Sequence, residues 1–129
     1  MTSQLGSVTF DCADALVVAR FWSAVLGRPL DPDGSSDFAA IGFAARRDSS
    51  GWASAGPEGT STWMFVRVPE PKTAKNRLHL DLVAADVQAE AARLVEFGAT
   101  HVVDVDEWGF TWTVMTDPKG NEFCIGAAR

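Results

Sequence analysis

The sequence predicts a small α+β domain built from two copies of one strand–helix–strands unit. Two runs that alternate between apolar and polar residues, Val8–Cys12 and Leu78–Leu82, predict half-buried strands. Each run precedes an apolar helical pattern that begins near an aspartate and ends at a glycine. The two aspartates, Asp14 and Asp86, are 72 residues apart. Phe10 and Leu82, in the two alternating runs, have the same separation. A separation shared by several residue pairs indicates an internal repeat.

The first copy spans about residues 5–69. The Asp14 side chain is suited to cap a helix over Ala15–Leu26, because an aspartate oxygen can accept the free N–H groups of the first turn. Gly27 is suited to end that helix in the left-handed conformation. Strands are then expected over two apolar runs, Phe38–Ala44 and Trp63–Val68.

The second copy spans about residues 76–128. After the strand Leu78–Leu82, Asp86 is the expected helix cap and Gly98 the expected helix terminator. Three further strands follow in the predicted order Thr100–Val105, Thr111–Thr116 and Glu122–Ala127. The second copy is therefore predicted as βαβββ, and the first matches it less regularly.

Composition sets limits on the partners. A chain of 129 residues has the usual size of one domain, so we expect a single domain over 1–129. The net charge of −6 argues against nucleic acid, because a phosphate backbone attracts basic surfaces. No apolar run approaches the ~18 residues that span a bilayer, so no membrane partner is expected. Two cysteines and the lack of an export signal predict a cytoplasmic protein.

The predicted strands have one face without a helix. If two sheets each bury one face under a helix, their remaining faces line a cupped cleft. Alternation along the strands assigns polar side chains from both copies to that cleft. They are Ser7, Thr9, Asp11, His79, Asp81, Glu122 and Cys124. This cleft is the predicted site for a small-molecule ligand.

Three segments together resemble a known family. They are Ala19–Gly27 (ARFWSAVLG), Arg77–Leu82 (RLHLDL) and Met115–Phe123 (MTDPKGNEF). In this order and at one module spacing, they resemble the vicinal oxygen chelate (glyoxalase/bleomycin-resistance/dioxygenase) superfamily, and most closely its short glyoxalase-like proteins. The resemblance implies two tandem βαβββ modules that form a cupped mixed sheet, and frequent homodimers. In metal-using relatives it also implies a divalent ion held by the first and last strands of each module.

The implied metal ligands are incomplete in this chain. His79 supplies an imidazole at the first-strand position of the second module, whereas its counterpart Ser7 is a poor ligand. The last-strand positions hold Cys124, where metal-using relatives carry a carboxylate, and Val66 or Met64. Mg²⁺, Mn²⁺ and Ni²⁺ prefer oxygen and imidazole donors, which serine, valine and cysteine do not supply.

Each candidate side chain has more than one interpretation. A softer site suited to Zn²⁺ is one, formed by His79, Asp81, Glu122 and Cys124. His79 is alternatively a general base, or a strand histidine bonded to Asp81 or Glu122. Glu122 is a candidate catalytic acid or base, or a brace for the Asp117–Asn121 turn. Cys124 is a ligand-binding residue, a nucleophile if its thiolate is stabilised, or a small buried hydrophobe.

Tryptophans are the other unusual feature, with five in the chain and no tyrosine. Trp52 and Trp108 fall in predicted loops that overhang the cleft, and Trp112 falls in a predicted strand. Exposed loop tryptophans usually contact something, either a flat aromatic or cationic ligand or a second subunit.

Two functions, from different classes, follow from these patterns. One is a glyoxalase-like lyase, isomerase or dioxygenase that uses a metal at His79 with help from Glu122 or Cys124. The other is a metal-free protein that resembles the bleomycin-resistance branch and sequesters a drug-like aromatic or cationic molecule. An accessory domain without chemistry is a third alternative. All three are forms of a glyoxalase-like protein that binds a small molecule, which is the function we expect.

Overall fold

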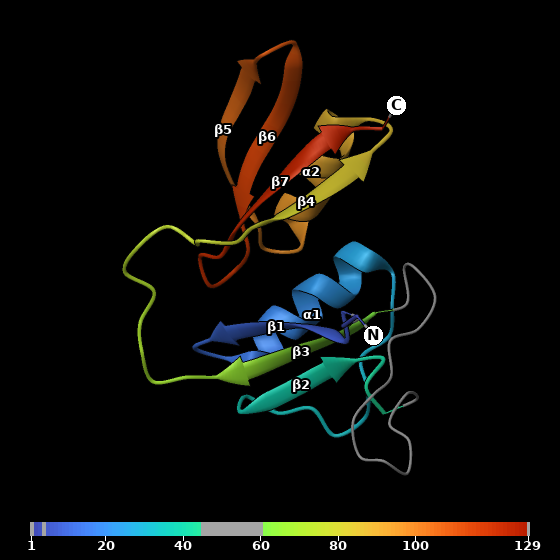
Figure 1. Cartoon of the computed structure of the whole chain (residues 1–129), viewed down its shortest axis with the longest axis vertical. Coiled ribbons are helices and arrows are strands. Elements are labelled where there is room, and N and C mark those ends of the chain that lie inside the picture. The colour runs from blue at the N-terminus through green and yellow to red at the C-terminus, as the bar shows by residue number, and fades with distance from the viewer. Residues whose placement is uncertain (1, 4, 45–60, 129) are drawn as a thin grey trace. The chain divides into compact units, whose positions relative to one another are not determined.

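The chain folds into two compact units, Met1–Pro71 and Lys72–Arg129. The structure is a computed structural model, and it describes residues 2–3, 5–44 and 61–128. In each unit one helix lies against one face of a mixed sheet (Figure 1). The predicted α+β class is confirmed. The single domain over 1–129 stays a prediction.

The described residues of unit 1 form one helix and a three-stranded sheet. Its elements are β1 (Ser7–Cys12), α1 (Ala15–Leu26), β2 (Phe38–Ile41) and β3 (Thr62–Arg67). The strand order is β1-β3-β2, with β1 parallel and β2 antiparallel to the central strand β3.

Aromatic rings fill the space between α1 and its sheet. The Phe10 ring on β1 lies 5.3 Å from Trp22 of α1 and 5.2 Å from Phe65 of β3, measured between centroids. Trp22 and Phe65 are fully buried. Phe10 therefore faces the helix, as the alternation predicts, and Thr9 lies on the opposite face of the sheet.

Unit 2 contains one helix and a four-stranded sheet. Its elements are β4 (Leu80–Ala84), α2 (Val87–Glu96), β5 (Thr100–Glu107), β6 (Phe110–Thr116) and β7 (Glu122–Ala127). The strand order is β4-β7-β6-β5, in which only the β4–β7 pair is parallel. The most deeply buried side chains of this unit are Leu94, Met115, Phe123 and Ile125. The predicted βαβββ order of the second module is confirmed.

The first module differs from the βαβββ order, because its described residues form only one strand before the helix and two after it. Strand β2 ends at Ile41, three residues earlier than predicted. The Asp31 carboxylate accepts the N–H groups of Gly42 (3.0 Å), Phe43 (2.8 Å) and Ala44 (2.8 Å), and Gly42 has a φ of 74°. These bonds draw the chain out of the ladder. The segment before β2 makes two backbone bonds to it, from the Asp31 N–H to the Ala40 carbonyl (2.9 Å) and from the Ser35 N–H to the Phe38 carbonyl (2.8 Å).

Strand β4 also departs from its predicted bounds. It begins at Leu80. The alternation along Leu78–Leu82 predicts that the three leucines lie under a helix, but Leu78 is 75% exposed. The reason is the length of its neighbour, because the ladder starts where Leu80 pairs with Phe123 at the beginning of β7. The prediction for Leu78 is wrong, whereas Leu80 and Leu82 are partly buried as expected.

The two helices begin with the same contact. The Asp14 carboxylate accepts the N–H of Val17 (3.1 Å), and the Asp86 carboxylate accepts the N–H of Ala89 (3.0 Å). Both helices also end near a glycine of positive φ, as predicted. The repeat seen in the sequence is therefore a repeat of local structure.

The cap of α2 can be tested by replacing Asp86 with alanine. Loss of a capping oxygen leaves an N–H of the first turn without its partner, so we expect the free energy of unfolding to fall by about 1 kcal/mol. Glu96→Ala is the matched control, because an acidic residue in the last turn opposes the helix dipole and its loss should be neutral or slightly stabilising. Urea denaturation measures both. Equal losses in the two variants would contradict this role for Asp86.

Candidate functional site

A pocket of about 590 Å³ opens on the face of the unit 2 sheet that α2 does not cover. Most of its wall is apolar and includes Val83, Trp108, Phe110, Trp112 and Val114. Polar side chains gather along the rest of its lining, namely Lys75, His79, Asp81, Glu122 and Cys124. A concave apolar wall with a few convergent polar groups is typical of small-molecule sites.

Strand register explains why these side chains share one face. Asp81 on β4 pairs with Cys124 on β7, and Cys124 pairs with Val114 on β6. Because side chains alternate along a strand, these three point away from α2. The neighbouring pair, Leu80 and Phe123, points toward the helix, and Phe123 is fully buried.

Three potential metal ligands meet at the polar side of the pocket. The donor atoms of His79, Asp81 and Cys124 all lie within 4.8 Å of one another. Within this group, His79 Nδ1 lies 3.3 Å from Asp81 Oδ1. The predicted proximity of His79 to Asp81 is thus observed. It is compatible with either a hydrogen-bonded pair or a ligand group.

The Cys124 thiol is not activated as a nucleophile. Burial raises its pKa, and the nearby Asp81 carboxylate raises it further, while Lys75 opposes the shift. Since the thiolate is the reactive form, a raised pKa keeps Cys124 in its unreactive form near neutral pH. Packing or metal binding explains this residue better than nucleophilic catalysis does.

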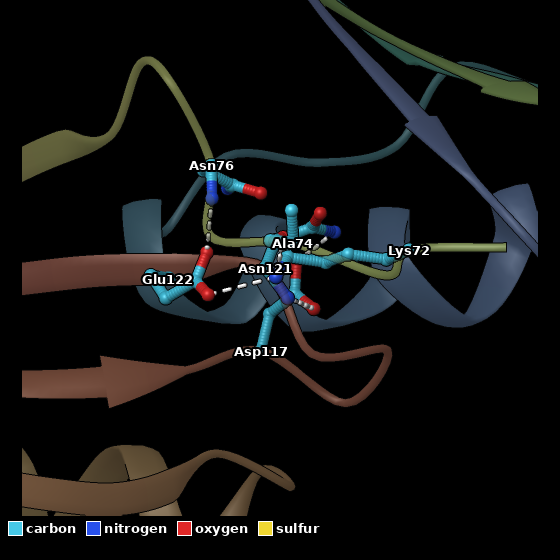
Figure 2. Close-up of polar contacts among 6 residues, drawn as sticks. All are labelled: Lys72, Ala74, Asn76, Asp117, Asn121 and Glu122. Carbon is cyan, nitrogen blue, oxygen red and sulfur yellow. Dashed lines mark hydrogen bonds and ion pairs between the residues drawn. The ribbon is translucent and has the colours of Figure 1, made fainter.

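Glu122 is occupied by two donors from the segment before β4. Its Oε1 accepts from Lys72 Nζ at 2.7 Å, and its Oε2 accepts from the Asn76 N–H at 3.0 Å (Figure 2). Lys72 also donates to the Ala74 carbonyl at 2.7 Å. Burial alone raises the Glu122 pKa, but these two donors outweigh it and the pKa is lowered. Glu122 therefore remains ionised near neutral pH and anchors the chain that leads into β4.

The turn that precedes Glu122 has its own brace. The Asp117 carboxylate is buried, and its Oδ1 accepts the N–H groups of Lys119 (2.9 Å) and Asn121 (3.1 Å). Its Oδ2 accepts from Asn121 Nδ2 at 2.9 Å (Figure 2). The structure thus assigns to Asp117 the bracing role that was one interpretation of Glu122.

Trp108 lies in a strained turn at the edge of the pocket. Trp108 and Gly109 connect β5 to β6 with φ values of 54° and 77°, and the flanking residues Glu107 and Phe110 pair across the ladder. Two positive φ values in a two-residue loop are the pattern of a type I′ turn, which favours asparagine before glycine. A non-glycine residue in this region costs about 1–3 kcal/mol. The Trp108 side chain is also 85% exposed. The residue therefore combines an unfavourable backbone conformation with a large apolar ring in water.

All six site residues predicted in the second module line this one pocket. They are His79, Asp81, Trp108, Trp112, Glu122 and Cys124. Of those predicted in the first module, Ser7, Thr9, Asp11 and Val66 share the face of the unit 1 sheet that α1 does not cover. Trp52 lies outside the described residues.

Several lining residues were not predicted. Val83 follows Asp81 on the same face of β4, so the alternation would have identified it if the strand had been extended beyond Leu82. Phe110 follows the turn and could have been found from the hairpin pattern. Lys75 and the Lys72–Glu122 pair have no local signal, because the paired residues are 50 positions apart.

A smaller hollow of about 340 Å³ lies between the start of α2 and the β5–β6 hairpin. Two carboxylates, Asp104 and Asp106, line it, and Asp104 accepts from Thr113 Oγ1 at 2.8 Å and lies 2.9 Å from His101 Nε2. The bonds from His101 and Thr113 lower the Asp104 pKa. This hollow is a weaker candidate than the larger pocket, because it is smaller and only one aromatic side chain, Trp112, lines it.

Comparisons with known proteins give one consistent result. Residues 7–126 match the family model described as a Glyoxalase-like domain. A glyoxalase/bleomycin resistance protein/dioxygenase family enzyme from Burkholderia phytofirmans PsJN is 17% identical, with a TM-score of 0.70, over 98% of this chain and 100% of that one. A fosfomycin resistance protein from Listeria monocytogenes is 10% identical, with a TM-score of 0.68, over 100% of this chain and 96% of that one.

A third similar structure is the bleomycin-binding protein of Streptomyces verticillus, in complex with copper(II)-bleomycin. It is 18% identical, with a TM-score of 0.60, and the similarity covers all of both chains. The search of curated proteins found no match. At these identities the solved structures support the fold.

Replacing Trp108 with asparagine tests the strained turn. Asparagine tolerates a positive φ better than tryptophan does, so we expect Trp108→Asn to raise the free energy of unfolding by about 1 kcal/mol. Trp108→Phe is the control, because it retains the backbone cost and should leave stability near that of the wild type. Thermal and urea unfolding measure both. A clear loss of stability in Trp108→Asn would show that the indole stabilises the fold.

Replacing Glu122 with glutamine tests its ion pair with Lys72. A carboxylate with a lowered pKa contributes stability above its unfolded pKa of about 4.3 and loses that contribution as the pH falls through the lower folded value. We therefore expect Glu122→Gln to be less stable than the wild type by about 1 kcal/mol at pH 7. The difference should shrink below about pH 4.3. Urea titrations from pH 7 to pH 3 would reject the ion pair if the difference did not depend on pH.

Proposed function

The chain belongs to the glyoxalase-like domain family, within the vicinal oxygen chelate superfamily, and we propose that it binds a small molecule in the pocket of unit 2. One observation carries this proposal. The helix-free face of one sheet combines an aromatic wall with a compact group of polar side chains around about 590 Å³. That volume lies within the range of about 300–1,000 Å³ in which small-molecule sites usually fall.

The wall favours a planar aromatic ligand. Trp108 is 85% exposed and Phe110 is 52% exposed, although apolar rings gain free energy when they leave water. Trp112 lies beside them in the same pocket. An aromatic molecule that stacked on this wall would cover rings that otherwise face solvent.

Local charge supports an aromatic ligand more than a cationic one. The net charge of −6 belongs to the whole chain, but Glu122 is already paired with Lys72. The lining contains one further acidic and one further basic side chain, Asp81 and Lys75, whose charges have opposite signs. We therefore expect stacking on the aromatic wall to decide which ligand binds, more than the net charge of the chain does. A cationic ligand is the weaker alternative.

The similarity to the bleomycin-binding protein supports binding as the function. That protein is described with copper(II)-bleomycin bound, so the fold can hold a drug-like molecule. The Listeria relative is described as a fosfomycin resistance protein. For this chain we propose the shared element, the holding of a small molecule, and leave the identity of the ligand to experiment.

The second candidate is a metal-dependent lyase or dioxygenase at His79. In metal-using relatives the resemblance places ligands on strands of both modules, yet the counterpart positions here hold Ser7 and Val66. Neither supplies a carboxylate or an imidazole, so the residues do not fit that ligand set for a hard divalent ion. We derive no reaction through such an ion.

Oligomeric state and location complete the proposal. Among the residues that the structure describes, no helix is long and apolar enough to cross a membrane. The homodimer implied by the resemblance and the cytoplasmic location stay predictions. Sedimentation equilibrium at several concentrations measures the first, and a monomer throughout would contradict it.

Calorimetric titration with planar aromatic compounds tests the binding function. The panel should contain neutral, cationic and anionic members, all measured in the presence of a chelator. We expect saturable binding of at least one compound and about a tenfold weaker affinity in Phe110→Ala, because a lost ring contact costs about 0.5–1.5 kcal/mol plus buried area.

Phe97→Ala is the matched control for that titration. Phe97 is an exposed phenylalanine of the same unit, at the end of α2, and it does not line the pocket. Its replacement should leave affinity unchanged. No saturable binding by any compound, or equal effects of the two replacements, would contradict the proposed site.

A further inference from the structure

The segment before β4 contributes one basic side chain to the pocket lining, Lys75. We propose that Lys75 binds the negatively charged group of the ligand, so that the pocket selects an aromatic molecule with a single anionic group, such as a carboxylate. The inference rests on the proposed function, because it names the chemical class of ligand that the aromatic pocket of unit 2 would take.

Hydrogen bonds fix the backbone on both sides of Lys75. On one side, the Ala74 carbonyl accepts from Lys72 Nζ at 2.7 Å. On the other side, the Asn76 N–H donates to Glu122 Oε2 at 3.0 Å. Lys72 Nζ also donates to Glu122 Oε1 at 2.7 Å, so both contacts lead to the first residue of β7 (Figure 2). The point from which the Lys75 side chain extends is therefore held at the edge of the pocket.

The charge of Lys75 has no partner within the described ranges. Its ammonium group takes part in no hydrogen bond or ion pair there, whereas the other lysine of this segment, Lys72, is paired with Glu122. The charge of Lys75 still acts on the lining. Burial and the Asp81 carboxylate raise the Cys124 pKa, and Lys75 opposes that rise. An anionic group in the pocket would therefore meet a cation that no described residue neutralises.

The two carboxylates of the lining already have polar neighbours. Glu122 accepts hydrogen bonds at both oxygens, from Lys72 and from the Asn76 N–H. Asp81 Oδ1 lies 3.3 Å from His79 Nδ1, and a neutral imidazole favours its proton on the nitrogen that faces a carboxylate. A cationic ligand group would compete with these neighbours, whereas an anionic group finds an available partner in Lys75.

The pairing of β6 with β7 sets the size of the ligand. Trp112 of the aromatic wall pairs with Gly126, and Glu122 begins the same strand four residues earlier. Four residues of a strand span about 13 Å, and the length of the Lys75 side chain shortens the gap. A Cβ at Gly126 would meet no atom within 4 Å, so the floor beside Trp112 is open to a ring. A fused aromatic ring with one carboxylate fits this span.

Naphthoate and naphthamide test the proposal, because the two probes have the same ring and nearly the same size but differ in charge. Calorimetric titration of the full chain near neutral pH measures both affinities. We expect naphthoate to bind about fivefold more tightly, which corresponds to about 1 kcal/mol for a partly exposed ion pair. The preference should shrink when the ionic strength rises from about 0.01 M to about 1 M, because the Debye length falls from about 30 Å to about 3 Å.

Three replacements assign the preference to one side chain. Lys75→Gln should remove it, so that the two probes bind equally, and Lys75→Arg should retain it because the charge is kept. Lys75 is exposed, so neither change disturbs the core. Lys119→Gln is the matched control, because Lys119 is an exposed lysine of the same unit that does not line the pocket. It should retain the preference for naphthoate.

Equal affinities of the wild type for the two probes, or tighter binding of naphthamide, would overturn the role of Lys75 and leave the aromatic pocket in place. A preference that persists in Lys75→Gln, or that is lost in Lys119→Gln, would overturn it as well. If neither probe binds saturably, the aromatic pocket itself is contradicted, and the role of Lys75 is contradicted with it. The failure of this inference and the failure of the proposed function are therefore distinguishable.

Discussion

The parallel pairing of β4 with β7 is the constraint on which the rest of unit 2 depends. It places Asp81 beside Cys124 on one face of the sheet and Leu80 beside Phe123 on the other. Since side chains alternate along strands, a shift of one residue would turn the polar pair toward α2 and the apolar pair toward solvent. The fully buried Phe123 under α2 thus stabilises the register that forms the pocket.

Alternation and repeat were sufficient to predict which second-module residues share a face. His79 and Cys124 are 45 positions apart, yet both were assigned to the helix-free face from local patterns. Their contact, however, depends on pairing that no local pattern contains. The same holds for Glu122, whose partners Lys72 and Asn76 come from a segment without regular structure. The positive φ of Trp108 could not be predicted from the sequence either, because tryptophan rarely adopts this backbone conformation.

The two modules share a scaffold but differ in the chemistry they offer. Asp14 and Asp86 make the same capping contact, so the repeat is retained where it stabilises helices. Ser7 and His79 occupy corresponding positions with very different ligand chemistry. Within the second module, His79 lines the proposed pocket with an imidazole, a group that the Ser7 hydroxyl does not supply in the first.

The most direct test of the pocket is an NMR titration that follows the indole N–H resonances with an aromatic ligand found by calorimetry. Trp108 and Trp112 line the pocket, whereas Trp22 and Trp63 are buried in the core of unit 1. Binding in the pocket predicts that the Trp108 and Trp112 resonances shift with saturation while those of Trp22 and Trp63 stay in place. Shifts of Trp22 or Trp63 without any change at Trp108 and Trp112 would contradict it.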